Sequence, residues 1–206
     1  MIEGIVFDLD GTLYDNDGMD LANKRAIVRA IAEQMKITED EAQEMLERAL
    51  GKYSSSEGRP SLYGAALQLG VADELIESFQ LEHVIPAKIL SADPELAREI
   101  ERLSGIVQLA LMTNTRTTIA AAAIQALGIP THAFAIIRGG DQLARPKPSA
   151  FDLLMICKEL NIKPEQCVSV GDRWSVDLAP AHEIGMQTKE VDGRDELYEW
   201  LCGISV

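Results

Sequence analysis

Hydrophobic residues are spaced differently in two parts of the chain. After residue 93, short apolar runs alternate with stretches of helical periodicity. Strands are predicted at 106–112, 133–137, 167–170 and 186–191, and helices at 94–103, 116–127, 149–160, 177–184 and 194–202. This alternation is typical of βαβ units, so we expect an α/β fold with a doubly wound parallel sheet that is covered by helices on both faces.

The first apolar run, "GIVF" at residues 4–7, belongs to the same predicted sheet. It ends in charged residues, which suits a buried central strand whose carboxyl end carries a site. Residues 17–80 have helical periodicity instead, with Thr38 and Glu41 in the spacing of a capping box. The predicted division is a core of residues 1–16 and 86–206 and a helical insertion of residues 17–85.

Composition and charge narrow the range of partners. The chain of 206 residues is 47% hydrophobic and 25% charged, as is usual for a globular protein. Its formal net charge of −14 would repel a polyanion, so we expect no nucleic acid partner. The three cysteines form no CxxC pattern, and no apolar run reaches the length of a membrane span. These features predict a cytoplasmic protein with no membrane partner.

Polar side chains follow four of the predicted strands. These residues are Asp8 and Asp10, Thr113 and Asn114, Lys147, and Asp172 with Asp177. The carboxyl ends of parallel strands meet at one edge of a sheet, and carboxylates gathered there raise each other's pKa unless a cation neutralises them. Oxygen ligands favour Mg²⁺ over zinc. Because Mg²⁺ keeps several waters, Asp8 and Asp172 with one backbone carbonyl would suffice as protein ligands.

The segments "DLDGTL", "LMTN", "RPKPSAF" and "VGDRWSVD" resemble the four ordered motifs of the haloacid dehalogenase superfamily. The resemblance covers essentially the whole chain and is to the phosphatase branch, in which a helical cap is inserted after the first motif. It implies a Rossmann-like catalytic core with a helical cap domain. It also implies a Mg²⁺-dependent phosphatase that acts through an aspartyl-phosphate on a small phosphorylated metabolite.

The same resemblance implies a role for each motif residue. Asp8 would be the nucleophile, and Asp10 would be the general acid for the leaving alcohol and then the base that activates water. Thr113 and Asn114 would bind phosphoryl oxygens, and Lys147 would neutralise charge and anchor the nucleophile.

The metal site implied by the resemblance uses carboxylates from two of the motifs. Asp8 and Asp172 would bind Mg²⁺ together with the backbone carbonyl of Asp10, and Asp177 would support the metal shell. Within the superfamily, dehalogenases lack an acid at the position of Asp10, because a halide leaving group needs no proton. The presence of Asp10 therefore favours phosphate-ester hydrolysis over C–halogen hydrolysis.

Substrate selection is expected to depend on the insertion, which follows the charged end of the first strand and could act as a lid. Its polar candidates are Lys52, Tyr53, Arg59 and Tyr63, with Lys52 and Arg59 as predicted substrate-binding residues. The segment "YSSSEGRPSLYG" is similar in placement to the cap loop of pyrimidine 5′-nucleotidases, so a nucleoside 5′-monophosphate is one expected substrate. Phosphoglycolate phosphatase and β-phosphoglucomutase share all four motifs and remain alternatives.

The sequence also leaves open two functions of other classes. A phospho-aspartate signalling module also combines an Asp, a Thr, a Lys and Mg²⁺ on a doubly wound sheet, and a catalytically silent binding protein could keep the same fold. Asp10 and the helical insertion argue against a signalling module. The complete set of motif residues argues against a catalytically silent protein. The chain is expected to be a monomer or a homodimer.

Overall fold

The computed structural model describes residues 2–51 and 61–204. Within the chain, the Cα positions form two compact units, one of residues 1–16 and 86–206 and the other of residues 17–85. No helix among the described residues is long and apolar enough to cross a lipid bilayer.

The first unit is built on a sheet of five parallel strands in the order β3-β2-β1-β4-β5. The strands are β1 (Gly4–Phe7), β2 (Gln108–Met112), β3 (Ile136–Arg138), β4 (Cys167–Gly171) and β5 (Gln187–Glu190). The central strand β1 is buried along its whole length, because β2 and β4 flank it and Phe7 is in register with both Leu111 and Val170. The predicted doubly wound parallel sheet, with this run at its centre, is confirmed.

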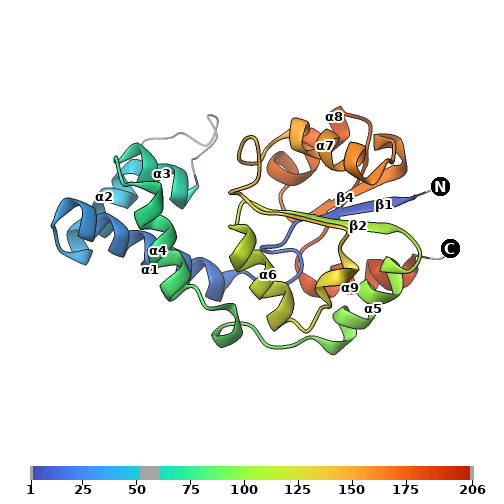
Figure 1. The fold of residues 1–206 in the computed structure, drawn as a ribbon, viewed down its shortest axis with the longest axis horizontal. Helices are drawn as coiled ribbons and strands as arrows, with labels where there is room; N and C mark the ends of the chain where they lie inside the picture. The colour runs from blue at the N-terminus through green and yellow to red at the C-terminus, as the bar shows by residue number, and fades with distance from the viewer. Residues whose placement is uncertain (1, 52–60, 205–206) are drawn as a thin grey trace. The chain divides into compact units, whose positions relative to one another are not determined.

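Helices cover both faces of this sheet. They are α5 (Pro94–Ser104), α6 (Thr117–Ala126), α7 (Ala150–Leu160), α8 (Ala179–Glu183) and α9 (Arg194–Gly203). Figure 1 shows α7 and α8 on one face and α5 and α9 on the other. Leu153 and Ile156 of α7 pack in one buried cluster with Val6 and Ala110 of the sheet, so the apolar face of α7 closes the core on its side.

Three short 3₁₀ helices lie between the longer elements in the part of the chain that the structure describes. They are η1 (Pro86–Lys88), η2 (Thr131–Ala133) and η3 (Pro164–Gln166). The predicted strand at 133–137 is wrong at its start, because the chain after Pro130 forms η2 before β3 begins at Ile136. A proline favours such a turn, since its φ angle is fixed and it has no N–H to donate to a sheet.

The helix predicted at 177–184 begins earlier and in a different form. Residues Trp174–Leu178 make a single π-helical stretch, η4, and the α-helix α8 follows it. The N–H of Ala179 donates to the carbonyl of Trp174, five residues back. Such π turns are rare and are often found at functional sites.

The second unit is entirely helical in its described residues. It consists of α1 (Asp17–Met35), α2 (Glu39–Gly51), α3 (Leu62–Gln68) and α4 (Asp73–His83). Ile27, Ile31, Leu46 and Ile76 are fully buried in its own core. The capping box at the start of α2 is present, because the Thr38 N–H donates to Glu41 Oε2 at 2.9 Å and the Glu41 N–H donates to Thr38 Oγ1 at 3.3 Å.

An ion pair joins the start of α5 to the start of α9. Arg194, at the start of α9, binds Asp93 through two hydrogen bonds, Nε–Oδ2 of 2.5 Å and Nη2–Oδ1 of 2.8 Å. Asp93 is also the N-cap of α5 and accepts the N–H of Leu96 at 3.0 Å. The Arg194 bonds, aided by the Leu96 N–H, hold the pKa of Asp93 below its usual range against the effect of burial.

We predict that Asp93→Asn lowers the free energy of unfolding by about 1–2 kcal/mol near pH 7, because asparagine keeps the cap but loses the charge. A carboxylate with a lowered folded pKa stabilises the fold above its unfolded pKa, and this contribution is lost as the pH falls through the folded pKa. Urea unfolding at about pH 7 and about pH 3 should therefore show a difference between wild type and variant that shrinks in acid.

The control is Asp195→Asn. Asp195 also pairs with Arg194, but its side chain is 92% exposed, so its loss should change stability little. An equal effect of the two substitutions, or a difference that does not depend on pH, would contradict the role assigned to Asp93.

Candidate active site

The chain turns sharply after β1, and this turn carries Asp8 and Asp10. The carbonyl of Leu9 accepts the N–H groups of Thr12 and Leu13, and Gly11 adopts a φ of +85°. A Cβ at Gly11 would lie 2.7 Å from Oδ2 of Asp172. Both the positive φ and the closeness of Asp172 therefore require glycine at residue 11.

A buried lysine lies between two buried carboxylates at this edge of the sheet. Lys147 Nζ donates to Asp8 Oδ1 and, at 2.6 Å, to Asp177 Oδ1. All three side chains are less than 5% exposed. The other oxygen of Asp8 accepts the hydroxyl of Thr12 at 3.2 Å. The structure thus brings together residues that are 139 and 30 positions apart in the sequence.

The charges in this group shift one another's pKa. Burial raises the pKa of Asp8 to about 7 against the attraction of Lys147, and the negative charge of Asp177 adds to the rise. Burial alone would lower the pKa of Lys147, but attraction to the two carboxylates outweighs it and raises that pKa. Lys147 therefore remains an ammonium ion and keeps one carboxylate oxygen of Asp8 anchored.

The loop that carries Lys147 is held by side chains rather than by regular structure. Asn114 pairs with its backbone, since Oδ1 accepts the Lys147 N–H at 2.7 Å and Nδ2 donates to the Lys147 carbonyl at 3.4 Å. Asp152 is 2% exposed and accepts the Ala144 N–H at 2.9 Å and the Ser149 hydroxyl at 2.6 Å. The loop is therefore fixed on both sides of Lys147.

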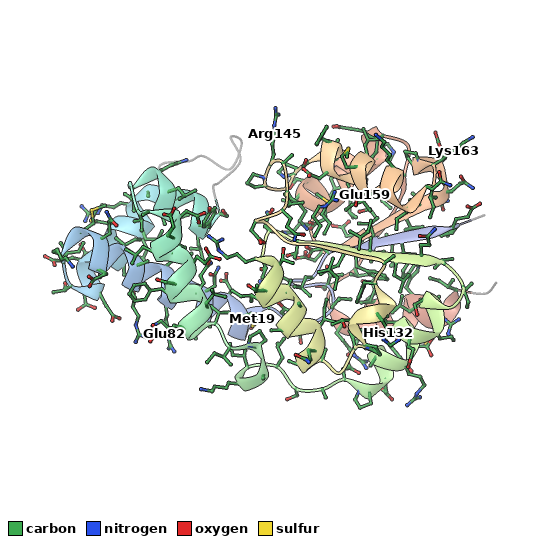
Figure 2. The ribbon with its side chains drawn as sticks, in the orientation of Figure 1. Met19, Glu82, His132, Arg145, Glu159 and Lys163 are labelled. Atoms are coloured by element: carbon green, nitrogen blue, oxygen red, sulfur yellow. The ribbon has the colours of Figure 1, made fainter. Side chains whose placement is uncertain are left out.

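The same loop shows how its two cationic residues differ. Arg145 is exposed, and Figure 2 shows its side chain pointing away from the sheet. Lys147, two residues later, is buried beside Asp8. The sequence did not single out Asp152, although an aspartate three residues after Ser149 is a recognisable helix-start signal.

Three hydroxyl groups hold the carboxylate of Asp10. The Tyr14 hydroxyl donates to Oδ1 at 2.5 Å, and the hydroxyls of Thr115 and Thr113 donate to Oδ2 at 2.7 and 3.2 Å. Burial, together with the charge of Asp10, raises the pKa of Tyr14 well above its ordinary value. Sequence reasoning missed both Tyr14 and Thr115. Thr113 and Asn114 lie beside these residues, and their hydrogen bonds go to Asp10 and to the Lys147 backbone.

An acidic group in the same place has the composition of a metal site. One ligand oxygen from each of Asp8, Asp172 and Asp177 lies within 4.8 Å of the others. Oδ1 of Asp172 is buried and has no hydrogen-bond partner, and its nearest cation is Arg173, whose Nε is 3.6 Å away. A buried carboxylate oxygen without a donor suits a bound cation, and hard oxygen ligands suit Mg²⁺.

The oxygens of Asp177 differ from those of Asp172. Oδ1 accepts Lys147, and Oδ2 accepts the Arg173 N–H at 3.1 Å. Burial raises the pKa of Asp172, opposed by the attraction of Arg173 and supported by repulsion from Asp177. The side chain of Asp172 is therefore the one with an oxygen free to coordinate, whereas Asp177 is already hydrogen-bonded within the protein.

The remaining candidates lie elsewhere. Lys52, Tyr53 and Arg59 fall outside the described residues. Tyr63 lies on α3, and its hydroxyl donates to Asp73 Oδ1 at 2.9 Å, so it links α3 to α4. Trp174 is 47% exposed at the start of η4, with its ring 6.1 Å from that of His182.

Comparison with known proteins supports the resemblance in the motifs. The family model of haloacid dehalogenase-like hydrolases matches residues 2–185. The chain is 30% identical to the phosphoglycolate phosphatase of Salmonella typhi in an alignment of 191 positions, and the match covers 83% of this chain and 74% of that protein. It is 27% identical to the glyceraldehyde 3-phosphate phosphatase of Methanocaldococcus jannaschii over 195 residues, which cover 93% of this chain and 85% of that protein.

The solved structures include the same fold. A HAD-superfamily hydrolase from Geobacter sulfurreducens superposes with a TM-score of 0.68 at 19% identity and covers 99% of this chain and 100% of its own. At that identity the likeness concerns the fold alone. Because the family model spans most of the chain, including all four motifs, the protein belongs to the haloacid dehalogenase-like hydrolase family.

Proposed function

We propose that the protein is a Mg²⁺-dependent phosphatase that hydrolyses a small phosphorylated metabolite through an aspartyl-phosphate on Asp8. The observation that carries this proposal is the buried group of Asp8, Lys147 and Asp177, beside an Asp172 oxygen that has no hydrogen-bond partner. Phosphoryl transfer asks a protein mainly for positioning and for positive charge around the phosphoryl oxygens. This group supplies a fixed nucleophile and a fixed cation.

In the proposed reaction a carboxylate oxygen of Asp8 attacks phosphorus, and the bond from phosphorus to the alcohol oxygen breaks. The Asp10 carboxyl gives its proton to that oxygen, so the alcohol leaves neutral. Asp10, now a carboxylate, takes a proton from water, whose oxygen attacks the phosphorus of the aspartyl-phosphate. Inorganic phosphate leaves, and Asp8 returns to its carboxylate form.

Asp8, Asp172 and the backbone carbonyl of Asp10 would hold Mg²⁺, with Asp177 supporting them. The ion would supply positive charge that neutralises the gathered carboxylates and polarises the phosphoryl oxygens. Asn114 has a second amide hydrogen beyond the one given to Lys147 and can donate it to a phosphoryl oxygen. Thr113 has a single hydroxyl hydrogen, so it reaches the substrate only by exchanging its bond to Asp10.

The substrates of the relatives bear on the choice of substrate. The relatives described above are phosphatases of phosphoglycolate, a small phosphorylated acid, and of glyceraldehyde 3-phosphate, a small phosphorylated aldehyde. The substrates of these relatives favour a small phosphorylated carbon compound over a nucleoside monophosphate. The nucleotide alternative stays open, because Lys52 and Arg59, on which it depends, lie outside the described residues.

The first test is Asp8→Asn, which should reduce Mg²⁺-dependent hydrolysis of p-nitrophenyl phosphate at least about a thousand-fold, because the amide is a poor nucleophile. Circular dichroism should show an unchanged fold. The exposed Asp192 offers a matched control, since Asp192→Asn removes the same charge away from the acidic group. Wild-type turnover by Asp8→Asn would overturn the assignment of the nucleophile.

The second test concerns the metal. Isothermal titration with MgCl₂ should show binding to the wild type that Asp172→Asn weakens at least about tenfold, because the unpartnered oxygen of Asp172 is replaced or neutralised. Asp192→Asn should bind as the wild type does. Equal Mg²⁺ affinity of Asp172→Asn and wild type would contradict the proposed ligand set.

The third test is a panel of phosphoglycolate, glyceraldehyde 3-phosphate, sugar phosphates and nucleoside monophosphates, assayed with and without Mg²⁺. We expect the largest kcat/KM for the small carbon phosphates. A preference for a pyrimidine nucleotide would favour the nucleotidase alternative, and conversion of one sugar phosphate into its isomer would favour a mutase.

A further inference from the structure

The hydroxyl of Tyr14 is a buried group whose role the proposed reaction does not yet include. Tyr14 is 4% exposed, and its hydroxyl lies 2.5 Å from Oδ1 of Asp10. Backbone contacts keep the two residues together, because the Gly11 N–H donates to the Tyr14 carbonyl at 3.1 Å and residues 10 and 14 form an isolated bridge. The turn thus places the phenol against the carboxylate that lies four residues earlier.

The opposite oxygen of Asp10 is held from another part of the chain. Thr115, in the segment after β2, donates its hydroxyl to Oδ2 at 2.7 Å. Its own N–H donates to Thr113 Oγ1 at 3.0 Å, and that hydroxyl also reaches Oδ2, at 3.2 Å. Hydroxyl donors from two segments therefore hydrogen-bond the two oxygens of the Asp10 carboxylate, which restrains both side-chain torsions of Asp10.

We infer that Tyr14 is a positioning residue that orients Asp10 for proton transfer to the leaving alcohol. This inference rests on the proposed function. Proton transfer needs the carboxyl within hydrogen-bond distance of the leaving oxygen, and a side chain that rotates freely spends less time there. A phenylalanine at residue 14 would fill nearly the same volume, so the hydroxyl is what distinguishes tyrosine at this position.

A purely structural role is the competing explanation, since a buried phenol needs a hydrogen-bond partner and Asp10 supplies one. The two explanations differ in their dependence on the leaving group. p-Nitrophenolate is a weak base and leaves without being protonated. An alkoxide is a strong base, so its departure depends on proton transfer from Asp10. Loss of positioning therefore slows alkyl phosphates selectively, while loss of structure slows all substrates alike.

The experiment compares Tyr14→Phe with wild type on p-nitrophenyl phosphate and on a series of alkyl phosphates. The measured quantity is kcat/KM, which reports only the steps up to release of the alcohol and so excludes hydrolysis of the aspartyl-phosphate. We expect kcat/KM to fall about 10- to 100-fold for alkyl phosphates and less than about threefold for p-nitrophenyl phosphate. The dependence of rate on leaving-group basicity should become steeper.

Two further variants connect the effect to Asp10. In an Asp10→Asn background, Tyr14→Phe should cause no additional selective loss, because the group that it orients is gone. Thr115→Val removes the closer of the two hydroxyl donors to the other oxygen and should show the same selectivity, so it carries the test if Tyr14→Phe does not fold. Tyr198→Phe, the same change on α9, should leave both rates unchanged.

The outcomes separate the inference from the proposed function. An equal loss of kcat/KM for aryl and alkyl phosphates, or no loss for either, overturns the positioning role while the phosphatase assignment stands. Wild-type protein that hydrolyses no phosphate ester refutes the proposed function, and the inference with it.

Discussion

The interaction on which the site depends is the buried ammonium of Lys147 between the carboxylates of Asp8 and Asp177. An unpaired charge in such a place would cost several kcal/mol, so the ammonium needs at least one of the two carboxylates, and both carboxylates depend on the ammonium. They come from the end of β1, the loop after β3 and the η4 turn after β4. The charges therefore meet only when the sheet has formed, and folding and assembly of the site are one event.

Much of this arrangement was predictable from the sequence. Periodicity identified the strands, and parallel strands bring their polar ends together, which is why Asp8, Asp172 and Lys147 were found as one group. The contacts of Tyr14 and Asn114 were not predictable in the same way. A tyrosine that directly follows Leu13 resembles a core residue, and its partner is fixed only by the turn at Gly11.

The irregular segments show the same limit. The π turn of η4 has no periodicity that distinguishes it from an ordinary helix, because one π turn leaves the hydrophobic spacing nearly unchanged. The loop before Lys147 is likewise organised by Asp152 and Asn114 through side-chain bonds to its backbone. Such hydrogen bonds depend on distances that exist only in the folded chain, so they cannot be predicted from the local sequence.

The close approach of Gly11 to Asp172 has a consequence for how substitutions at this site are interpreted. Every other residue would add a Cβ that lies 2.7 Å from a carboxylate oxygen, in a backbone conformation that disfavours side chains. The position therefore strongly favours glycine, although glycine has no chemistry to offer. If residue 11 were invariant among variants or related proteins, the cause would be steric and conformational. If Asp8 were invariant, the cause would be its part in the proposed reaction.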